Sequence, residues 1–159
     1  MRYIIHEKLL TFGNDSTIKN EKMQPVFDVD GKALSVLNTL VIRDMEKNKV
    51  ATIKQKLPSI TPTYEIIREG QESAKITKHL ISPFVDRFTV DIPGPDDLHI
   101  KESLLSEHEY TISAKDQVVA TVSKGWFKEL ESYDVDIAPG QDDVLILACV
   151  LVLELIENR

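Results

Sequence analysis

The sequence predicts a mainly β fold: a closed antiparallel barrel of about twelve strands that encloses a central hydrophobic C-terminal helix. One observation is a series of short strand-like segments that recur about every 11 residues, a spacing typical of sandwiches and barrels. The other is the apolar run 144–153, which has no polar side. A helix that is apolar all round must be buried on all sides. The run is shorter than the roughly 18 residues that a membrane span needs, so we expect the strands to enclose it.

The predicted strands are rich in β-branched and aromatic residues and are separated by turn signals such as Asp30-Gly31. They lie near 3–9, 16–20, 25–29, 33–43, 49–57, 64–69, 73–80, 84–91, 98–104, 109–114, 117–127 and 131–137.

Alternation along these segments predicts which residues face the core. Ala51 and Ile53 fall on one face, and Lys54 falls on the other. Near the end of the chain, the same period places Val118 on the inner face and Val119 on the outer one. One face of each strand is therefore expected to point inward and the other to be wet or half-wet.

The helix is predicted over 142–157, where Asp142 and Asp143 can cap its first turn and meet the positive end of its dipole. About 16 residues make a rod of roughly 24 Å. Burial of its aliphatic side chains contributes on the order of 15–30 kcal/mol as an upper value.

The size of the helix decides between the β architectures. An eight-stranded barrel is filled by its own side chains, whereas an eleven-stranded one is known to hold a helix. The alternative is a sandwich whose helix is covered by a second protomer.

Composition narrows the class of protein. The chain has 159 residues, a net charge of −7 and one cysteine, which predicts one domain over 1–159 and disfavours a general nucleic-acid binder. Cys149 lies inside the apolar run and is expected to be a buried thiol in a reducing compartment. The N-terminus meets charge too early for a signal peptide, so a cytoplasmic location is expected.

Three segments resemble a known family. They are 37–44 with 50–57 and 62–66, then 119–127 with its Lys-Gly-Trp-Phe motif, and finally 133–137 leading into the apolar helix. Together they resemble the LURP-one-related family, in the superfamily of tubby C-terminal domains and phospholipid scramblases. The resemblance implies a barrel of about twelve strands around a hydrophobic helix.

The resemblance implies less about activity. Tubby domains bind phosphoinositides through a basic surface, but their contact residues cannot be matched to positions here. Scramblases are linked to calcium and lipid movement, yet this chain lacks their cysteine cluster, and its helix contains Glu154.

A basic cluster is the first candidate site. Two predicted neighbouring strands and their turn carry Arg43, Lys47, Lys49, Lys54 and Lys56. On one outward face these side chains could meet a phosphate or an anionic lipid headgroup. Lysines on the surface of a sheet also protect it from aggregation, which is the alternative interpretation.

An acidic cluster is the second candidate. Asp134, Asp136, Asp142 and Asp143 lie close together in the sequence, and calcium binds to several such oxygens on a bent loop. The alternative is solubility at the strand end together with capping of the helix. No cofactor is expected apart from this calcium.

The function predicted from the sequence is a non-enzymatic binding module for an anionic ligand or a membrane phospholipid surface. No phosphate loop, nucleophile elbow or dinucleotide motif is present in the sequence. The alternatives are a protein–protein interaction or scaffold domain and a calcium-responsive lipid-associated protein. The expected partners are thus an anionic phospholipid or another protein, with peripheral association at the membrane.

Overall fold

Twelve strands and one helix make up the described part of the chain. The computed structural model describes residues 1–6, 16–31, 39–57, 60–80, 85–94, 96–105, 109–124 and 132–157. The strands are β1 (Arg2–His6), β2 (Ser16–Asn20), β3 (Pro25–Asp30), β4 (Thr39–Asp44), β5 (Lys49–Gln55), β6 (Thr63–Ile67), β7 (Ala74–Lys78), β8 (Arg87–Asp91), β9 (Leu98–Glu102), β10 (Tyr110–Ala114), β11 (Gln117–Lys124) and β12 (Ser132–Ile137). The helix is α2 (Asp143–Glu157).

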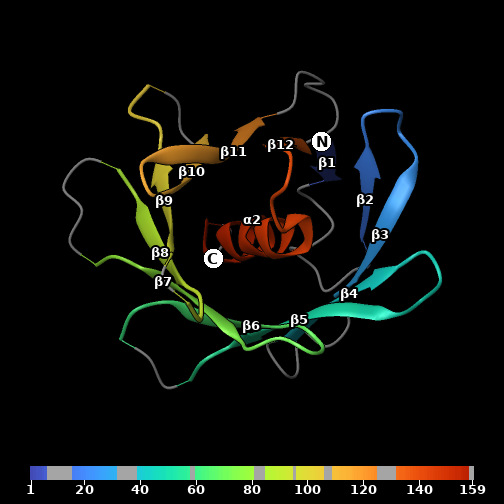
Figure 1. The fold of residues 1–159 in the computed structure, drawn as a ribbon, viewed down its shortest axis with the longest axis horizontal. Coiled ribbons are helices and arrows are strands. Elements are labelled where there is room, and N and C mark those ends of the chain that lie inside the picture. The colour runs from blue at the N-terminus through green and yellow to red at the C-terminus, as the bar shows by residue number, and fades with distance from the viewer. Residues whose placement is uncertain are drawn as a thin grey trace.

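The strands form a closed antiparallel barrel. Each strand pairs with its neighbours in the sequence, and β1 closes the ring by pairing with both β2 and β12 (Figure 1). Because the ring is closed, none of the described strands has an edge left to pair with another chain. The predicted fold class is confirmed.

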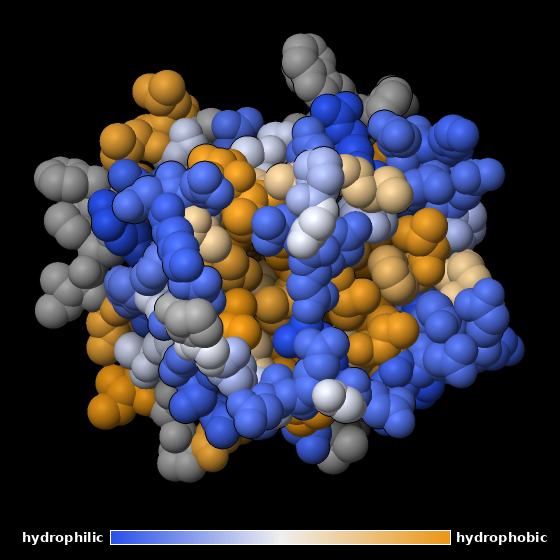
Figure 2. Space-filling view, viewed as in Figure 1, coloured by the Kyte–Doolittle hydropathy of each residue, from blue (hydrophilic) through white to orange (hydrophobic). Residues whose placement is uncertain are grey.

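Helix α2 lies inside the ring of strands (Figure 1). From Leu145 to Leu153 no residue is more than 4% exposed. Figure 2 shows hydrophobic residues toward the centre of the same view, crossed by a band of hydrophilic residues, and hydrophilic residues along much of the rim. The helix therefore supplies the centre of the core, and the inward side chains of the strands pack around it. Within the described residues, no helix is long and apolar enough to cross a membrane.

Alternate residues of the strands face this core. In β5, Ala51 and Ile53 are each 1% exposed, whereas Lys54 is exposed. Further round the ring, Phe88 of β8 meets Tyr110 of β10 edge to face, with ring centroids 6.3 Å apart. The alternation predicted for β5 is confirmed.

One prediction about β11 is wrong. Val118 is 55% exposed and Val119 is 6% exposed, the reverse of the expected order. The pairing of β10 with β11 shifts between Ile112 and Ser113, so that Ala120 faces Ile112 but Val118 faces Ser113. This β-bulge leaves Val119 as an extra residue and breaks the period of two. The Trp126-Phe127 segment lies outside the described residues.

The two ends of the barrel differ. Because successive strands run in opposite directions, the β2–β3, β4–β5 and β6–β7 turns lie at one end, together with the start of α2. We call this end the N-terminal mouth. The opposite end, where α2 finishes, is the C-terminal mouth. Its described connections include the exposed side chains of Leu57, Ile60, Leu80, Leu104 and Leu105.

Candidate anion-binding surfaces

The predicted basic cluster lies on the outer face of β4 and β5. Arg43 of β4 is opposite Lys49 of β5, with a register shift beside them. Lys54 is opposite Thr39 of β4 and Glu65 of β6. Lys56 follows β5 and forms an ion pair with Glu65 at 3.6 Å. The structure therefore brings these cations onto one side of the barrel, but it also brings a carboxylate among them.

The turn between β4 and β5 is organised by Asp44. Its carboxylate accepts hydrogen bonds from the backbone N–H of Glu46 at 3.0 Å and of Asn48 at 2.8 Å, and from the Asn48 amide at 3.1 Å. These bonds lower the pKa of Asp44, chiefly through the backbone N–H of Asn48. Lys47 has a φ of 68° at the tip and is exposed. The Asp44 carboxylate is thus engaged by the amide groups of its own turn.

A groove of about 570 Å³ crosses this outer face. Its walls include Lys49 and Lys54, and its other lining residues are Thr39, Val41, Val50, Ala51, Thr52, Ile67 and Glu69. The groove combines two ammonium groups with hydroxyls and half-buried apolar side chains. Glu69 adds a negative charge at its border.

The predicted acidic cluster is divided by the fold. Asp134 and Asp136 project from the outer side of β12, because the residues between and beside them are buried. Asp136 pairs with Arg2 at 3.7 Å. Asp142 and Asp143 instead lie at the N-terminal mouth, where α2 begins. Among the residues that the structure describes, no three His, Cys, Asp or Glu side chains are placed to hold a metal ion.

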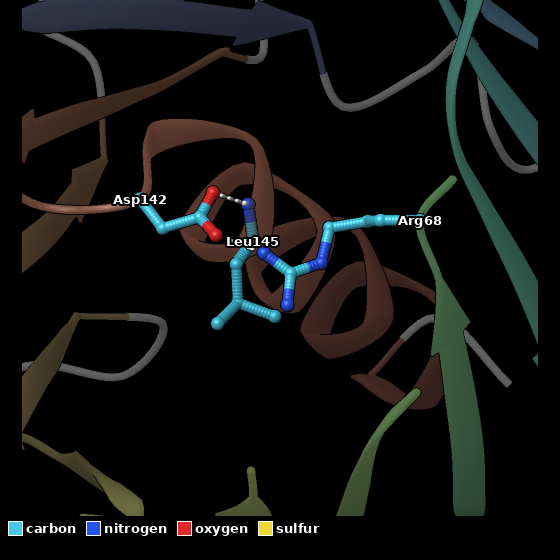
Figure 3. Close-up of polar contacts among 3 residues, drawn as sticks. All are labelled: Arg68, Asp142 and Leu145. Atoms are coloured by element: carbon cyan, nitrogen blue, oxygen red, sulfur yellow. Dashed lines mark hydrogen bonds and ion pairs between the residues drawn. The ribbon is translucent and has the colours of Figure 1, made fainter. Parts of the chain in front are cut away.

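Asp142 caps the helix and neutralises a buried arginine. Its Oδ1 accepts a hydrogen bond from the backbone N–H of Leu145 at 3.1 Å, and its Oδ2 pairs with Arg68, which reaches in from the end of β6 (Figure 3). Arg68 is only 7% exposed, and burial lowers its pKa. Since a cation beside a helix N-terminus is unfavourable, Asp142 offsets both the positive end of the dipole and the guanidinium.

Asp143 has a partner of its own. Its Oδ2 accepts a hydrogen bond of 2.6 Å from the hydroxyl of Tyr3 in β1. Burial, this bond and the nearby carboxylate together raise the pKa of Tyr3. Further along the helix, burial raises the pKa of the Cys149 thiol to about 12. The two aspartates at the start of α2 thus bind residues of β1 and of the end of β6. Their position at the helix start fits the capping interpretation.

Sequence reasoning missed a second cationic groove, on the outer face of β8, β9 and β10. It has a volume of about 400 Å³ and is lined by His79, Arg87, Phe88, His99, Ile100, Lys101, Thr111 and Ser113. Its charged residues are spread over 79–101, so the sequence shows no cluster. The signal that could have found it is the antiparallel pairing of two successive alternating strands, β8 and β9, which sets Arg87 opposite Lys101.

Comparison with known proteins identifies the family. A sequence model of the family described as LURP-one-related matches residues 1–154. The chain belongs to the LURP-one-related family. One relative is the uncharacterised protein YxjI of Bacillus subtilis strain 168, 25% identical over 154 residues that cover 94% of this chain and 90% of YxjI.

A solved structure shows that the barrel of this LURP-one-related chain is a known fold. An X-ray structure of a protein from Arabidopsis thaliana covers 99% of this chain and 92% of its own, with a TM-score of 0.68 and 16% identity. At this identity the likeness concerns the fold alone, which is the tubby-like barrel.

Proposed function

We propose that this protein is a non-enzymatic binding module for an anionic ligand, the phosphate-bearing headgroups of a membrane surface, which it meets as a peripheral cytoplasmic protein of one domain. The observation that carries the proposal is the outer face of β4 to β6. There Arg43, Lys49 and Lys54 are gathered beside a groove of about 570 Å³.

The chemistry of this face suits a phosphate. Each lysine or arginine near an anionic surface contributes about 1 kcal/mol of attraction. The hydroxyls of Thr39 and Thr52 on the groove wall add hydrogen-bonding groups beside the ammonium ions. Val41 and Ile67 give the groove apolar surface for the carbon atoms of a headgroup.

Two features limit the strength of this attraction. Glu65 and Glu69 border the cations, and the whole chain carries a net charge of −7. Binding should therefore be local, weak and strongly dependent on salt, because charges beyond about 8–10 Å are screened at physiological ionic strength.

A vesicle panel tests the proposal. Co-sedimentation is measured with phosphatidylcholine vesicles that contain phosphatidylserine, cardiolipin or a phosphoinositide, at 50 and 150 mM salt. We expect binding to at least one anionic composition and at least a fivefold weaker affinity for Lys49→Glu/Lys54→Glu.

The matched control is Lys19→Glu/Lys22→Glu, which reverses the same number of charges on β2 and its turn. It should bind as the wild type does. Absence of binding to every anionic composition, or equal affinity of the wild type and the Lys49/Lys54 variant, would reject this face as the site.

A protein partner is the second candidate, favoured by the C-terminal mouth. Leu57 and Ile60 are 64% and 93% exposed, and they border a pocket of about 200 Å³ that also includes Ile156 of α2. Exposed apolar side chains beside a pocket are a common feature of protein interfaces. If the partner is a second copy, sedimentation equilibrium should show dimers that Ile60→Ser abolishes, whereas a monomer at 100 μM would reject self-association.

A further inference from the structure

The outer face of β8, β9 and β10 carries two rows of cationic and hydroxyl side chains. In the first row, Arg87 of β8 is opposite Lys101 of β9, which is opposite Thr111 of β10. His79 extends this row, because its backbone N–H donates to the carbonyl of Arg87 at 2.8 Å. Directly opposite residues on paired strands have their Cβ atoms about 5 Å apart, so these side chains project side by side from the barrel.

The second row lies one pleat away. Thr89 of β8 is opposite His99 of β9, which is opposite Ser113 of β10. The ring Nε2 of His79 is 2.6 Å from the Thr89 hydroxyl and so joins the two rows. Residues of both rows line the groove of about 400 Å³.

The groove differs from the β4–β6 face in its charge balance. None of its described lining residues is Asp or Glu. Of the described carboxylates nearby in the sequence, Asp86 pairs with Lys78 at 3.3 Å and Asp96 with Lys115 at 3.1 Å. Asp91 is opposite Lys75 of β7, and neither Asp91 nor Glu102 lines the groove. Like charges directly opposite each other on a sheet destabilise it, so Arg87 beside Lys101 favours a bound anion.

The side chains fit a phosphate ester. Guanidinium groups bind phosphate with two parallel hydrogen bonds, and ammonium groups bind it as a point charge. Arg87 and Lys101 provide one of each, and the hydroxyls of Thr89, Thr111 and Ser113 can donate to the remaining oxygens.

Exposed leucines beside the first row indicate which kind of molecule carries the phosphate. Leu80 directly follows His79 and is 63% exposed. Leu104 and Leu105, in the connection that follows β9 and Lys101, are 70% and 98% exposed. These leucines lie at the C-terminal mouth, next to the cationic row. A cationic surface adjoining exposed apolar side chains is the arrangement that binds a membrane interface.

We infer that the β8–β10 groove is a second anion site, which holds the phosphate of an anionic phospholipid headgroup while Leu80, Leu104 and Leu105 enter the boundary of the acyl chains. This site is separate from the β4–β6 face, and its test does not depend on the outcome there.

Charge reversal at the groove provides the first test. The probe is phosphatidylcholine vesicles with 20 mol% phosphatidic acid, and binding is measured by co-sedimentation. Since each cation near such a surface contributes roughly a factor of five in affinity, Arg87→Glu/Lys101→Glu should bind at least 20-fold more weakly. Lys19→Glu/Lys22→Glu, which carries the same net charge, should bind as the wild type does.

The two proposed surfaces can be told apart in the same assay. A loss confined to the Arg87/Lys101 variant supports the groove and rejects the β4–β6 face as the site for this lipid. A loss confined to Lys49→Glu/Lys54→Glu assigns this lipid to the β4–β6 face and rejects the groove. Equal binding of the Arg87/Lys101 variant and the wild type, or no binding of the wild type to these vesicles, overturns the inference.

Leucine variants and a soluble probe identify the source of the phosphate. Leu104→Ser/Leu105→Ser, whose charges are unchanged, should reduce vesicle binding at least fivefold and leave the weak binding of glycerol 1-phosphate, followed by NMR shifts of Thr111 and Ser113, unaltered. Vesicle binding that is unaffected by the leucine variant and is competed away by millimolar glycerol 1-phosphate would overturn the lipid assignment in favour of a soluble phosphate ester. Native circular dichroism spectra of both variants confirm that they fold.

Discussion

The inner and outer surfaces of the barrel wall are built from the same strands, but their side chains differ in burial and in charge. The inner positions of β5 and β8, such as Ile53 and Phe88, are each 1% exposed and belong to the same hydrophobic core as the apolar helix. The outer positions of these strands differ from one side of the barrel to the other. On β4–β6, Glu65 lies opposite Lys54, whereas on β8–β10 Arg87 lies opposite Lys101. Packing thus constrains the inner positions, whereas the outer positions vary in charge.

The largest expected difference between the two surfaces concerns stability. Leu151→Ala on α2, where the side chain is 0% exposed, should lower the free energy of unfolding by about 3–5 kcal/mol, because it removes methyl groups and leaves a cavity. Lys54→Ala on the outer face should change it by less than about 0.5 kcal/mol. Urea unfolding followed by circular dichroism measures both. Similar losses for the two variants would contradict the enclosure of the helix.

The helix start should give the next largest effect. Asp142→Ala removes the cap of α2 and leaves Arg68 buried without its counter-charge, so we expect a loss of about 2–4 kcal/mol in the free energy of unfolding, measured by the same urea titration. Asp142→Asn keeps a side chain that can cap the helix and should lose about 1 kcal/mol less.

The matched comparison for this prediction is Asp136→Ala. Its carboxylate is on the outer surface and pairs with Arg2, both side chains being more than half exposed, so the loss should stay below about 1 kcal/mol. An Asp136 variant as unstable as the Asp142 variant would show that the inner ion pair has no special role.

The dependence of stability on pH tests whether water reaches the Cys149 thiol on the inner side of the barrel. Burial raises the pKa of the Cys149 thiol from 9.0 to about 12. Well below pH 9 the thiol is protonated in both the folded and the unfolded chain, so it adds no pH dependence there. Between pH 9 and 12 only the unfolded chain releases the proton, and stability should fall by up to about 1.4 kcal/mol per pH unit. The control Cys149→Ala lacks this contribution, so the gap in stability between the two proteins should narrow from pH 8.5 to pH 10. A constant gap would mean that the thiol is accessible to water.

The smallest expected effect concerns the outer face of β4–β6. Glu65→Gln removes the carboxylate that pairs with Lys56, and it should change stability by less than about 0.5 kcal/mol. Affinity for anionic vesicles should rise roughly fivefold. Asp116→Asn, in the β10–β11 turn, removes one negative charge elsewhere and should leave the affinity unchanged. A matching rise in both variants would point to net charge rather than to this face.

The sequence was sufficient to predict most of the inner surface. The apolar run of α2 and the alternation around Ile53 depend only on neighbours along the chain, so a period of two and a missing polar side predict them. The prediction failed at Val118 and Val119, because a bulge depends on how β10 and β11 pair. The final helix begins at Asp143, with Asp142 as its cap, close to the predicted start.

The outer surface was predicted less completely, for a physical reason. The cluster from Arg43 to Lys56 is visible in the sequence because a short hairpin keeps these residues close along the chain. Arg87 and Lys101 come together only through the register of β8 and β9. Similarly, nothing in the sequence pairs Arg68 with Asp142, which lie 74 positions apart. Interactions that depend on register or on closure of the ring require the structure.

The position of the core helix after the described strands has a consequence for biosynthesis. The ribosome produces all twelve strands before residues 143–157, so the nascent chain carries an apolar wall with nothing to fill it. Closure of the ring also joins β1 to β12, two segments made far apart in time during translation. The core can therefore be completed only once α2 has emerged from the ribosome. A chain that stops before α2 would expose its whole inner surface and become a target for chaperones and proteases.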